Sequence, residues 1–214
     1  MNIEFLRRLS NAFGPPGAEE EAMMVLREEL EAYADEVQVD KLGNIFFTHK
    51  GDEDAPVIML AAHTDEVGVF VTFIEDSGVL RFHPWGIVDG LLLGQRFRLR
   101  GRKGDLYGIV GSKPPHVMSE EERKKPVPAE ELFIDIGAMT RGEAEAKGAF
   151  EGMMGVFDME FRDLGDGYLM GKSFDDRAGC YVMAEVFKWT KGKPYNVVAV
   201  GTVQEEVGLR GSKT

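Results

Sequence analysis

The stretch Pro56-Val57-Ile58-Met59-Leu60-Ala61-Ala62-His63-Thr64-Asp65 decides how this chain can fold. Its first half is an unbroken apolar run, which is typical of a buried strand in a parallel sheet. The stretch ends in His63 and Asp65, and side chains two residues apart on an extended backbone point to the same side. We expect both at one site beyond the carboxyl end of the strand, where open α/β sheets place ligands. By itself, this pair fits a solvated loop equally well.

Two further acidic motifs occupy comparable positions. The apolar run over residues 196–203 predicts a second buried strand, which leads directly into Glu205 and Glu206. The pair Asp175-Asp176 precedes residues 178–190, whose apolar spacing predicts a helix. The ends of strands and the starts of the following helices share one edge of an α/β sheet, so we expect the three motifs to meet there.

Carboxylates gathered in this way predict a metal site. Adjacent carboxylates repel one another in a partly buried site, and a divalent cation or a shared proton relieves that repulsion. One histidine with two or three carboxylates suits zinc, cobalt or manganese better than calcium. Of two adjacent glutamates, one can bind metal while the other acts as a general base on water.

The remaining sequence predicts two kinds of structure. Apolar spacing indicates helices over residues 3–13 and 18–34, and alternation over residues 37–48 indicates a hairpin. Between residues 69 and 162, short strands alternate with glycine-containing turns, which favours a small barrel or sandwich. The charged run over residues 119–126 predicts an exposed loop.

We therefore predict an α/β fold with a mixed, mostly parallel sheet and flanking helices, interrupted by an inserted small β-barrel domain. The catalytic α/β domain would comprise residues 1–68 and 163–214, and the insertion residues 69–162.

Composition narrows the class of protein. The 214 residues carry 25 basic and 37 acidic side chains, a formal net charge of −12, which disfavours nucleic acid and anionic membranes as partners. No apolar run approaches the roughly 18 residues of a membrane helix, and the amino terminus lacks signal-peptide features. The single cysteine, Cys180, fits a reducing cytoplasm and is expected to be a buried apolar residue rather than a nucleophile.

Three motifs together resemble a known family. They are AAHTDEVG over residues 61–68, KSFDDRAG over residues 172–179 and VQEEVGLRG over residues 203–211. They are similar to the motifs of the tetrahedral, or deblocking, aminopeptidases. These dinuclear metallopeptidases include glutamyl aminopeptidases and proteins once labelled cellulase M.

This resemblance implies a role for each residue of the site. His63 would bind one of two divalent metal ions, zinc or cobalt, and Asp175 would bridge both. Glu206 would bind a metal, Glu205 would be the general base, and Asp65 would orient His63. The implied substrates are peptides, cleaved at their amino termini. The implied assembly is a homo-oligomer, with dimers formed through the inserted domain and combined into a tetrahedral dodecamer.

The chain also departs from the family. The resemblance implies two further metal ligands, an aspartate and a histidine, downstream of the glutamate pair, and the sequence ends at Thr214 before either. We therefore expect a truncated enzyme with little or no activity as it stands. One alternative is a catalytically dead fragment that retains the oligomerising domain. Another is an endoglucanase-type glycoside hydrolase, which would leave the histidine unexplained.

Overall fold

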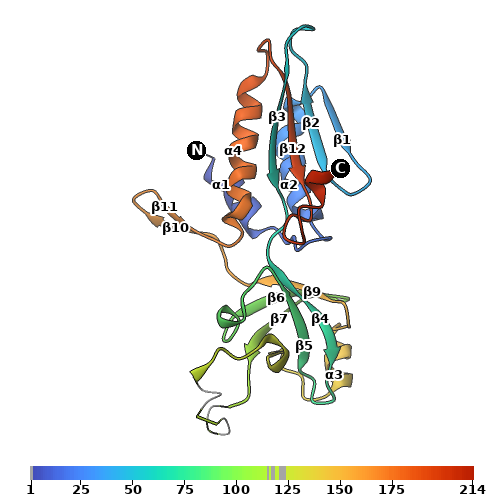
Figure 1. Cartoon of the computed structure of the whole chain (residues 1–214), viewed down its shortest axis with the longest axis vertical. Helices are drawn as coiled ribbons and strands as arrows, with labels where there is room; N and C mark the ends of the chain where they lie inside the picture. Colours follow the sequence, from blue (N-terminus) through green and yellow to red (C-terminus); the bar gives the residue numbers. More distant parts are fainter. Residues whose placement is uncertain (1, 115, 117–118, 121–123) are drawn as a thin grey trace. The chain divides into compact units, whose positions relative to one another are not determined.

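The computed structural model describes residues 2–114, 116, 119–120 and 124–214. The chain forms two compact units (Figure 1). The first, called here the α/β unit, combines Met1–Glu66 with Met159–Thr214. The second, called the barrel unit, is Val67–Asp158.

A four-stranded sheet forms the centre of the α/β unit. Its strands lie in the order β1 (Glu36–Val39), β2 (Ile45–His49), β12 (Asn196–Thr202) and β3 (Val57–His63). Only β12 and β3 are parallel, while β1 with β2 and β2 with β12 are antiparallel. The sheet is mixed, as predicted, but the prediction of mostly parallel pairing is wrong for the described residues. The hairpin of β1 and β2 was predicted, but the antiparallel pairing of β2 with β12 was not, because it joins residues far apart in the chain.

Three helices pack on this sheet. They are α1 (Ile3–Asn11), α2 (Glu20–Leu30), which continues into the 3₁₀ turn η1 (Glu31–Tyr33), and α4 (Phe174–Thr190). One buried apolar cluster joins them to the strands; it includes Phe5, Leu26, Phe47, Phe187 and Ala199. The helix predicted over residues 3–13 is confirmed, and it spans Ile3–Asn11. Its apolar spacing and its cap lie close together in the sequence, so a local pattern could predict it. Asn2 accepts a hydrogen bond from the N–H of Phe5 and caps the first turn.

The apolar run that predicted a buried β3 is exposed at its start. Val57, Ile58 and Met59 are 66%, 46% and 63% exposed, and burial begins only towards Ala62. The reason is the position of β3 at the edge of the sheet, where it pairs with β12 alone among the described residues. The prediction of burial is therefore wrong for this half of the strand.

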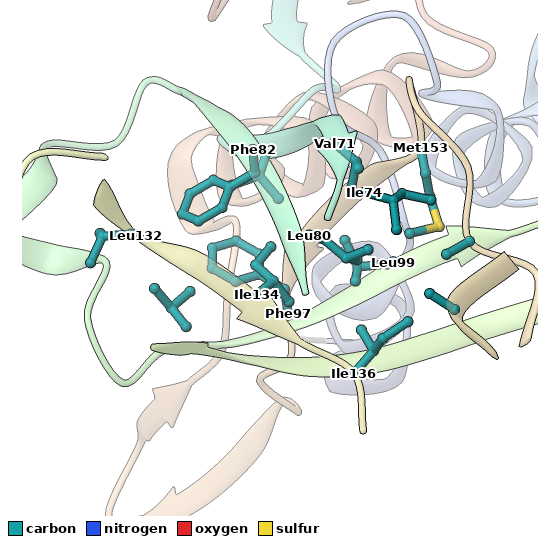
Figure 2. Close-up of a cluster of buried hydrophobic side chains, with 14 of the residues drawn as sticks. Val71, Ile74, Leu80, Phe82, Phe97, Leu99, Leu132, Ile134, Ile136 and Met153 are labelled. Carbon is teal, nitrogen blue, oxygen red and sulfur yellow. The ribbon is translucent and has the colours of Figure 1, made fainter. Parts of the chain in front are cut away.

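The barrel unit is a closed six-stranded barrel. Its strands are β4 (Gly68–Ile74), β5 (Leu80–Trp85), β6 (Arg96–Gly101), β7 (Gly104–Gly111), β8 (Phe133–Asp135) and β9 (Met154–Phe157). Figure 2 shows Phe97, Leu99, Leu80 and Ile134 converging on its interior, and each is fully buried. At Gly155 in β9, a Cβ atom would lie 2.5 Å from Leu99 Cδ2, so the close packing here requires glycine.

The remaining elements are short. Helix α3 (Arg141–Lys147) and the 3₁₀ turns η2 (Asp89–Leu91) and η5 (Ala129–Glu131) belong to the barrel unit, while η6 (Gly211–Lys213) belongs to the α/β unit. The hairpin of β10 (Arg162–Gly165) and β11 (Tyr168–Met170) was not predicted. Of the predicted charged loop over residues 119–126, residues 121–123 lie outside the described residues. Within the described ranges, no helix is long and apolar enough to cross a membrane.

The barrel core makes a direct stability test. Phe97 is fully buried and stacks on Phe157 with ring centroids 4.9 Å apart. We expect Phe97→Ala to lower the free energy of unfolding by about 3–5 kcal/mol, because it removes buried apolar surface and leaves a cavity. Urea unfolding followed by near-ultraviolet circular dichroism measures this loss. Tyr107→Ala is the control, since Tyr107 is 59% exposed; equal losses in the two variants would contradict the core described here.

Candidate active site

The parallel pairing of β3 with β12 brings the predicted motifs together. Its register places Thr202 opposite His63, so the two strands end side by side. The N–H of Thr64 then donates to the backbone oxygen of Thr202 at 2.7 Å, which extends the pairing by one residue. The loop that carries Glu205 and Glu206 therefore begins beside His63.

His63 is the centre of the resulting cluster. Its Nε2 lies 3.0 Å from Asp175 Oδ1 and 3.9 Å from Glu205 Oε2. Ligand atoms of His63, Glu205 and Glu206 all lie within 4.8 Å of one another. On the other side of the ring, Nδ1 lies 3.2 Å from the backbone oxygen of Asp65. In the neutral ring, a proton on Nδ1 would leave the Nε2 lone pair directed at the carboxylates, as metal binding requires.

Asp65, predicted to orient His63, contacts two parts of the site. Its Oδ1 lies 3.5 Å from His63 Nδ1. The same carboxylate, fully buried, accepts hydrogen bonds from the backbone N–H groups of Glu205 at 2.9 Å and Glu206 at 3.0 Å. Burial alone would raise the pKa of Asp65, but His63 and these two N–H groups outweigh it and lower the pKa. Asp65 therefore links the two strand ends.

The carboxylates also shift the ionisation of their neighbours. Burial by itself lowers the pKa of His63, yet Asp65, Asp175 and Glu205 overcome that effect and raise it to about 9. Burial raises the pKa of Glu206, and the negative charges of Glu205, Asp65 and Asp175 raise it further against the opposing pull of His63. Such mutual perturbation is typical of functional sites.

Asp175 and Asp176 have different surroundings, although a cis peptide bond joins them. The side chain of Asp175 is 90% exposed apart from its approach to His63. Asp176 Oδ1 instead accepts a hydrogen bond from the N–H of Gly179 at 3.0 Å, within the first turn of α4. A Cβ atom at residue 179 would lie 2.2 Å from that oxygen, so a larger residue there would displace the Asp176 carboxylate. The Asp176 carboxylate is thus engaged inside α4, and Asp175 remains available for a ligand.

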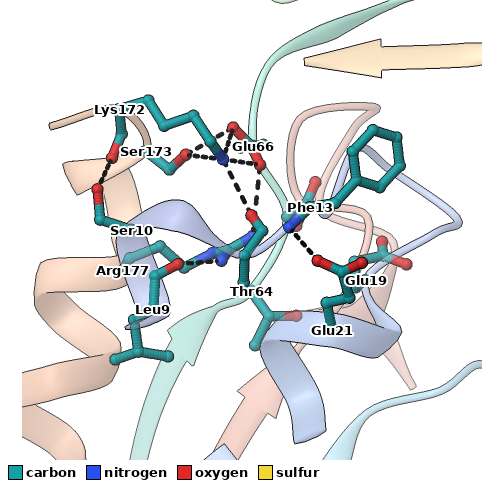
Figure 3. A network of polar contacts seen from close by, with 12 residues as sticks. Leu9, Ser10, Phe13, Glu19, Glu21, Thr64, Glu66, Lys172, Ser173 and Arg177 are labelled. Atoms are coloured by element: carbon teal, nitrogen blue, oxygen red, sulfur yellow. Dashed lines mark hydrogen bonds and ion pairs between the residues drawn. The ribbon is translucent and has the colours of Figure 1, made fainter. Parts of the chain in front are cut away.

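A buried ion-pair network lies behind the cluster (Figure 3). Lys172 Nζ donates to Glu66 Oε1 at 2.6 Å and Oε2 at 2.8 Å, and also to the backbone oxygen of Ala12 at 2.9 Å. Ser173 donates to Glu66 Oε2 at 2.6 Å, and Arg177 Nη2 lies 3.8 Å from Glu66 Oε1. The network ties the segment after His63 to the segment that carries Asp175. Glu66, Lys172, Ser173 and Arg177 lie in the motifs, but no role was predicted for them.

Glu19 was also missed. Nothing in the pattern of residues 18–34 indicates that it approaches the site, yet Glu19 is only 5% exposed and accepts a hydrogen bond from the N–H of Gln204 at 3.1 Å. Burial raises its pKa, and the charge of Asp65 adds to that effect. Cys180 behaves as expected: it is fully buried, and burial raises the pKa of its thiol to about 12.

Comparison with known proteins gives a consistent picture. A family model described as M42 glutamyl aminopeptidase matches residues 43–214. A lysyl aminopeptidase from Pyrococcus furiosus is 37% identical over 86% of this chain, and the match covers 53% of that protein. The relative FrvX from Escherichia coli K12 matches the whole chain at 38% identity. This chain spans only 60% of the length of FrvX.

Solved structures agree with this likeness. A TET aminopeptidase from Thaumarchaeota archaeon SCGC AB-539-E09 superimposes with a TM-score of 0.94 at 45% identity, covering 99% of this chain and 61% of that one. Pyrococcus horikoshii TET1 is described as assembling into a tetrahedron or a large octahedral shell. It superimposes with a TM-score of 0.86 at 35% identity, covering 99% of this chain and 63% of that one. A Thermotoga maritima protein described as an endoglucanase superimposes with a TM-score of 0.79 at 32% identity, covering 97% of this chain and 62% of that one.

The ion-pair network makes a stability prediction. Lys172→Met should lower the free energy of unfolding of the α/β unit by about 3–5 kcal/mol, because it leaves the buried Glu66 carboxylate without its ammonium partner. Urea unfolding measures the effect. Lys50→Met is the matched control, since the ion pair of Lys50 with Glu36 at 3.8 Å is exposed and should contribute nothing measurable. A Lys172→Met protein as stable as this control would contradict the network's role.

Proposed function

Because this chain belongs to the M42 glutamyl aminopeptidase family, as its motifs predicted, we propose that its α/β unit is the catalytic unit of a metal-dependent aminopeptidase. The proposed enzyme removes amino-terminal residues from peptides. The observation that supports it most directly is the gathering of His63, Glu205 and Glu206 within 4.8 Å, with Asp175 3.0 Å from His63. One imidazole among carboxylates is a donor set that zinc or cobalt accepts.

The proposed roles follow from these positions. His63, Asp175 and Glu206 would hold the metal, with the exposed Asp175 free to bridge two ions. Two divalent ions bound there would polarise the scissile carbonyl and an attacking water. Glu205, whose Oε2 lies 3.9 Å from His63 Nε2, would take a proton from that water and pass it to the leaving amine. Asp65 would hold His63 and the Glu205–Glu206 backbone in place.

Two alternative functions of the chain are endoglucanase activity and a non-catalytic, assembling role. Endoglucanase activity is suggested by the description of the Thermotoga maritima neighbour. Glycoside hydrolysis, however, uses two carboxyl groups without metal, and it gives no role to His63 at the centre of the cluster. The alternative of a catalytically dead fragment predicts large assemblies with less than one zinc per chain, which light scattering and metal analysis would reveal.

We also propose that the protein is cytoplasmic and self-associates. The lone buried Cys180 fits a reducing compartment. The likeness to Pyrococcus horikoshii TET1, with its tetrahedral and octahedral assemblies, supports a homo-oligomer. We assign its dimer contacts to the barrel unit because the motif resemblance implies dimers formed through the inserted domain.

Substitution of each glutamate separates the two proposed roles. Glu206→Gln should weaken zinc binding to this chain by more than about 10–100-fold, the range found even for outer partners of a metal. Glu205→Gln should leave zinc affinity nearly unchanged but, in a version as long as the relatives, slow hydrolysis of an aminoacyl-4-nitroanilide by about 10²–10⁴-fold. Calorimetry and absorbance measure the two effects. Undiminished hydrolysis by Glu205→Gln would exclude Glu205 as the base, and chelator-insensitive hydrolysis would exclude the metal.

Zinc binding should also release a proton. The pKa of His63 is raised to about 9, so its imidazole is protonated at pH 7.5 and must lose that proton to bind metal. We expect about one proton released per zinc at pH 7.5 and progressively less as the pH rises through 9. Calorimetric titration in buffers of different ionisation enthalpy counts the protons, and His63→Asn is the control. A release that does not change between pH 7.5 and 9.5 would contradict the assignment.

A further inference from the structure

Four consecutive peptide groups after β12 donate hydrogen bonds to side chains instead of to another strand. The N–H of Val203 donates to Asn44 Oδ1 at 3.0 Å, and that of Gln204 to Glu19 Oε1 at 3.1 Å. The N–H groups of Glu205 and Glu206 donate to the two oxygens of Asp65 at 2.9 and 3.0 Å. Buried N–H groups need such partners, and here three separate segments supply them.

All three acceptors are buried: Asn44 is 1%, Glu19 5% and Asp65 0% exposed. Hydrogen bonds to a carboxylate are stronger than those between neutral groups, and low exposure protects them from competing water. Glu19 and Asp65 are both carboxylates and repel one another, so their joint burial depends on the N–H groups between them. The loop and its acceptors therefore stabilise each other.

Glu19 does not have the role that its position suggests. It occupies the N-cap position of α2, yet its side chain makes no capping hydrogen bond. Its Oε1 accepts from the N–H groups of Gly17 at 2.8 Å and Gln204 at 3.1 Å. Gln204 has a φ of +56°, in the left-handed region that non-glycine residues rarely occupy. Such a conformation persists only where the surroundings impose it, and here the N–H of this residue donates to the Glu19 carboxylate.

We infer that Glu19 is a positioning residue of the active site. By holding the peptide group of Gln204, it fixes the backbone direction from which the Glu205 and Glu206 side chains reach His63. Asn44 and Asp65 hold the peptide groups on either side. Glu19 touches neither metal nor substrate in this scheme, so its effect passes through the loop alone. The link to metal binding rests on the proposed function, whereas the hold on the loop does not.

Hydrogen exchange measured by mass spectrometry tests the hold on the loop in this 214-residue chain. Glu19→Ala should raise amide exchange in a peptide spanning residues 203–210 by about tenfold or more, because local opening no longer breaks the Glu19 bond. Glu19→Gln should restore slow exchange, since its amide oxygen can accept the same N–H groups. Exchange in β2 reports global unfolding and should stay unchanged in both variants.

Glu21→Ala is the matched control. Glu21 lies in the first turn of the same helix and its Oε2 also accepts a backbone N–H, but from Phe13 at 2.8 Å. It should leave exchange over residues 203–210 unaltered. If Glu19→Ala leaves this exchange unaltered too, if it raises exchange equally in β2, or if Glu19→Gln fails to restore it, the inference is overturned.

Zinc affinity tests the consequence for the site. Glu19→Ala should weaken zinc binding by about 10–100-fold, as loss of an outer partner does, while Glu19→Gln and Glu21→Ala bind as the parent chain does. Unchanged affinity in Glu19→Ala, despite faster loop exchange, would overturn the positioning role. Absence of zinc binding in the parent chain would count against the proposed function, and the exchange measurements would still decide whether Glu19 holds the loop.

Discussion

The parallel pairing of β3 with β12 is the constraint on which the site depends. The two strands are far apart in sequence, yet their register ends both at the same level, with Thr202 opposite His63. A shift of one residue would turn His63 to the opposite face of the sheet. It would also displace Asp65 from the N–H groups of the loop that follows β12. Both His63 and the glutamate pair therefore take their places from one ladder of backbone hydrogen bonds.

Beyond the strand ends, buried carboxylates keep the segments that donate hydrogen bonds to them close to β3. Asp65 and Glu66 are adjacent and both buried, but they satisfy different parts of the molecule. Asp65 accepts hydrogen bonds from two N–H groups of the loop after β12. Glu66 accepts hydrogen bonds from the ammonium group of Lys172 and the hydroxyl of Ser173. An unpaired buried carboxylate would be very costly, so each one requires its donor segment to stay close. This requirement draws the loop after β12 and the segment before α4 towards the end of β3.

The parts of this structure that could be predicted from sequence are those formed by residues close together in the chain. Helix α1 was predicted correctly because its apolar spacing and its cap lie within a few residues of one another. The exposure of Val57 and Met59 could not be predicted, since an apolar run has the same appearance at the centre and at the edge of a sheet. The antiparallel majority of the sheet was missed for a similar reason: the pairing of β2 with β12 joins residues about 150 positions apart, which no local pattern reports.

By itself, the sequence determined which family the chain resembles and which residues are candidates for the site, because motif residues and their spacing can be read directly from the chain. Tertiary structure alone decided how those residues are held. Glu19 lies 185 positions from Gln204 along the chain, yet it accepts the hydrogen bond of that residue. Glu66 and Lys172 form their ion pair across 106 positions. Such partners are selected by burial, which leaves each charged group and each N–H only the neighbours that the fold brings within hydrogen-bonding distance.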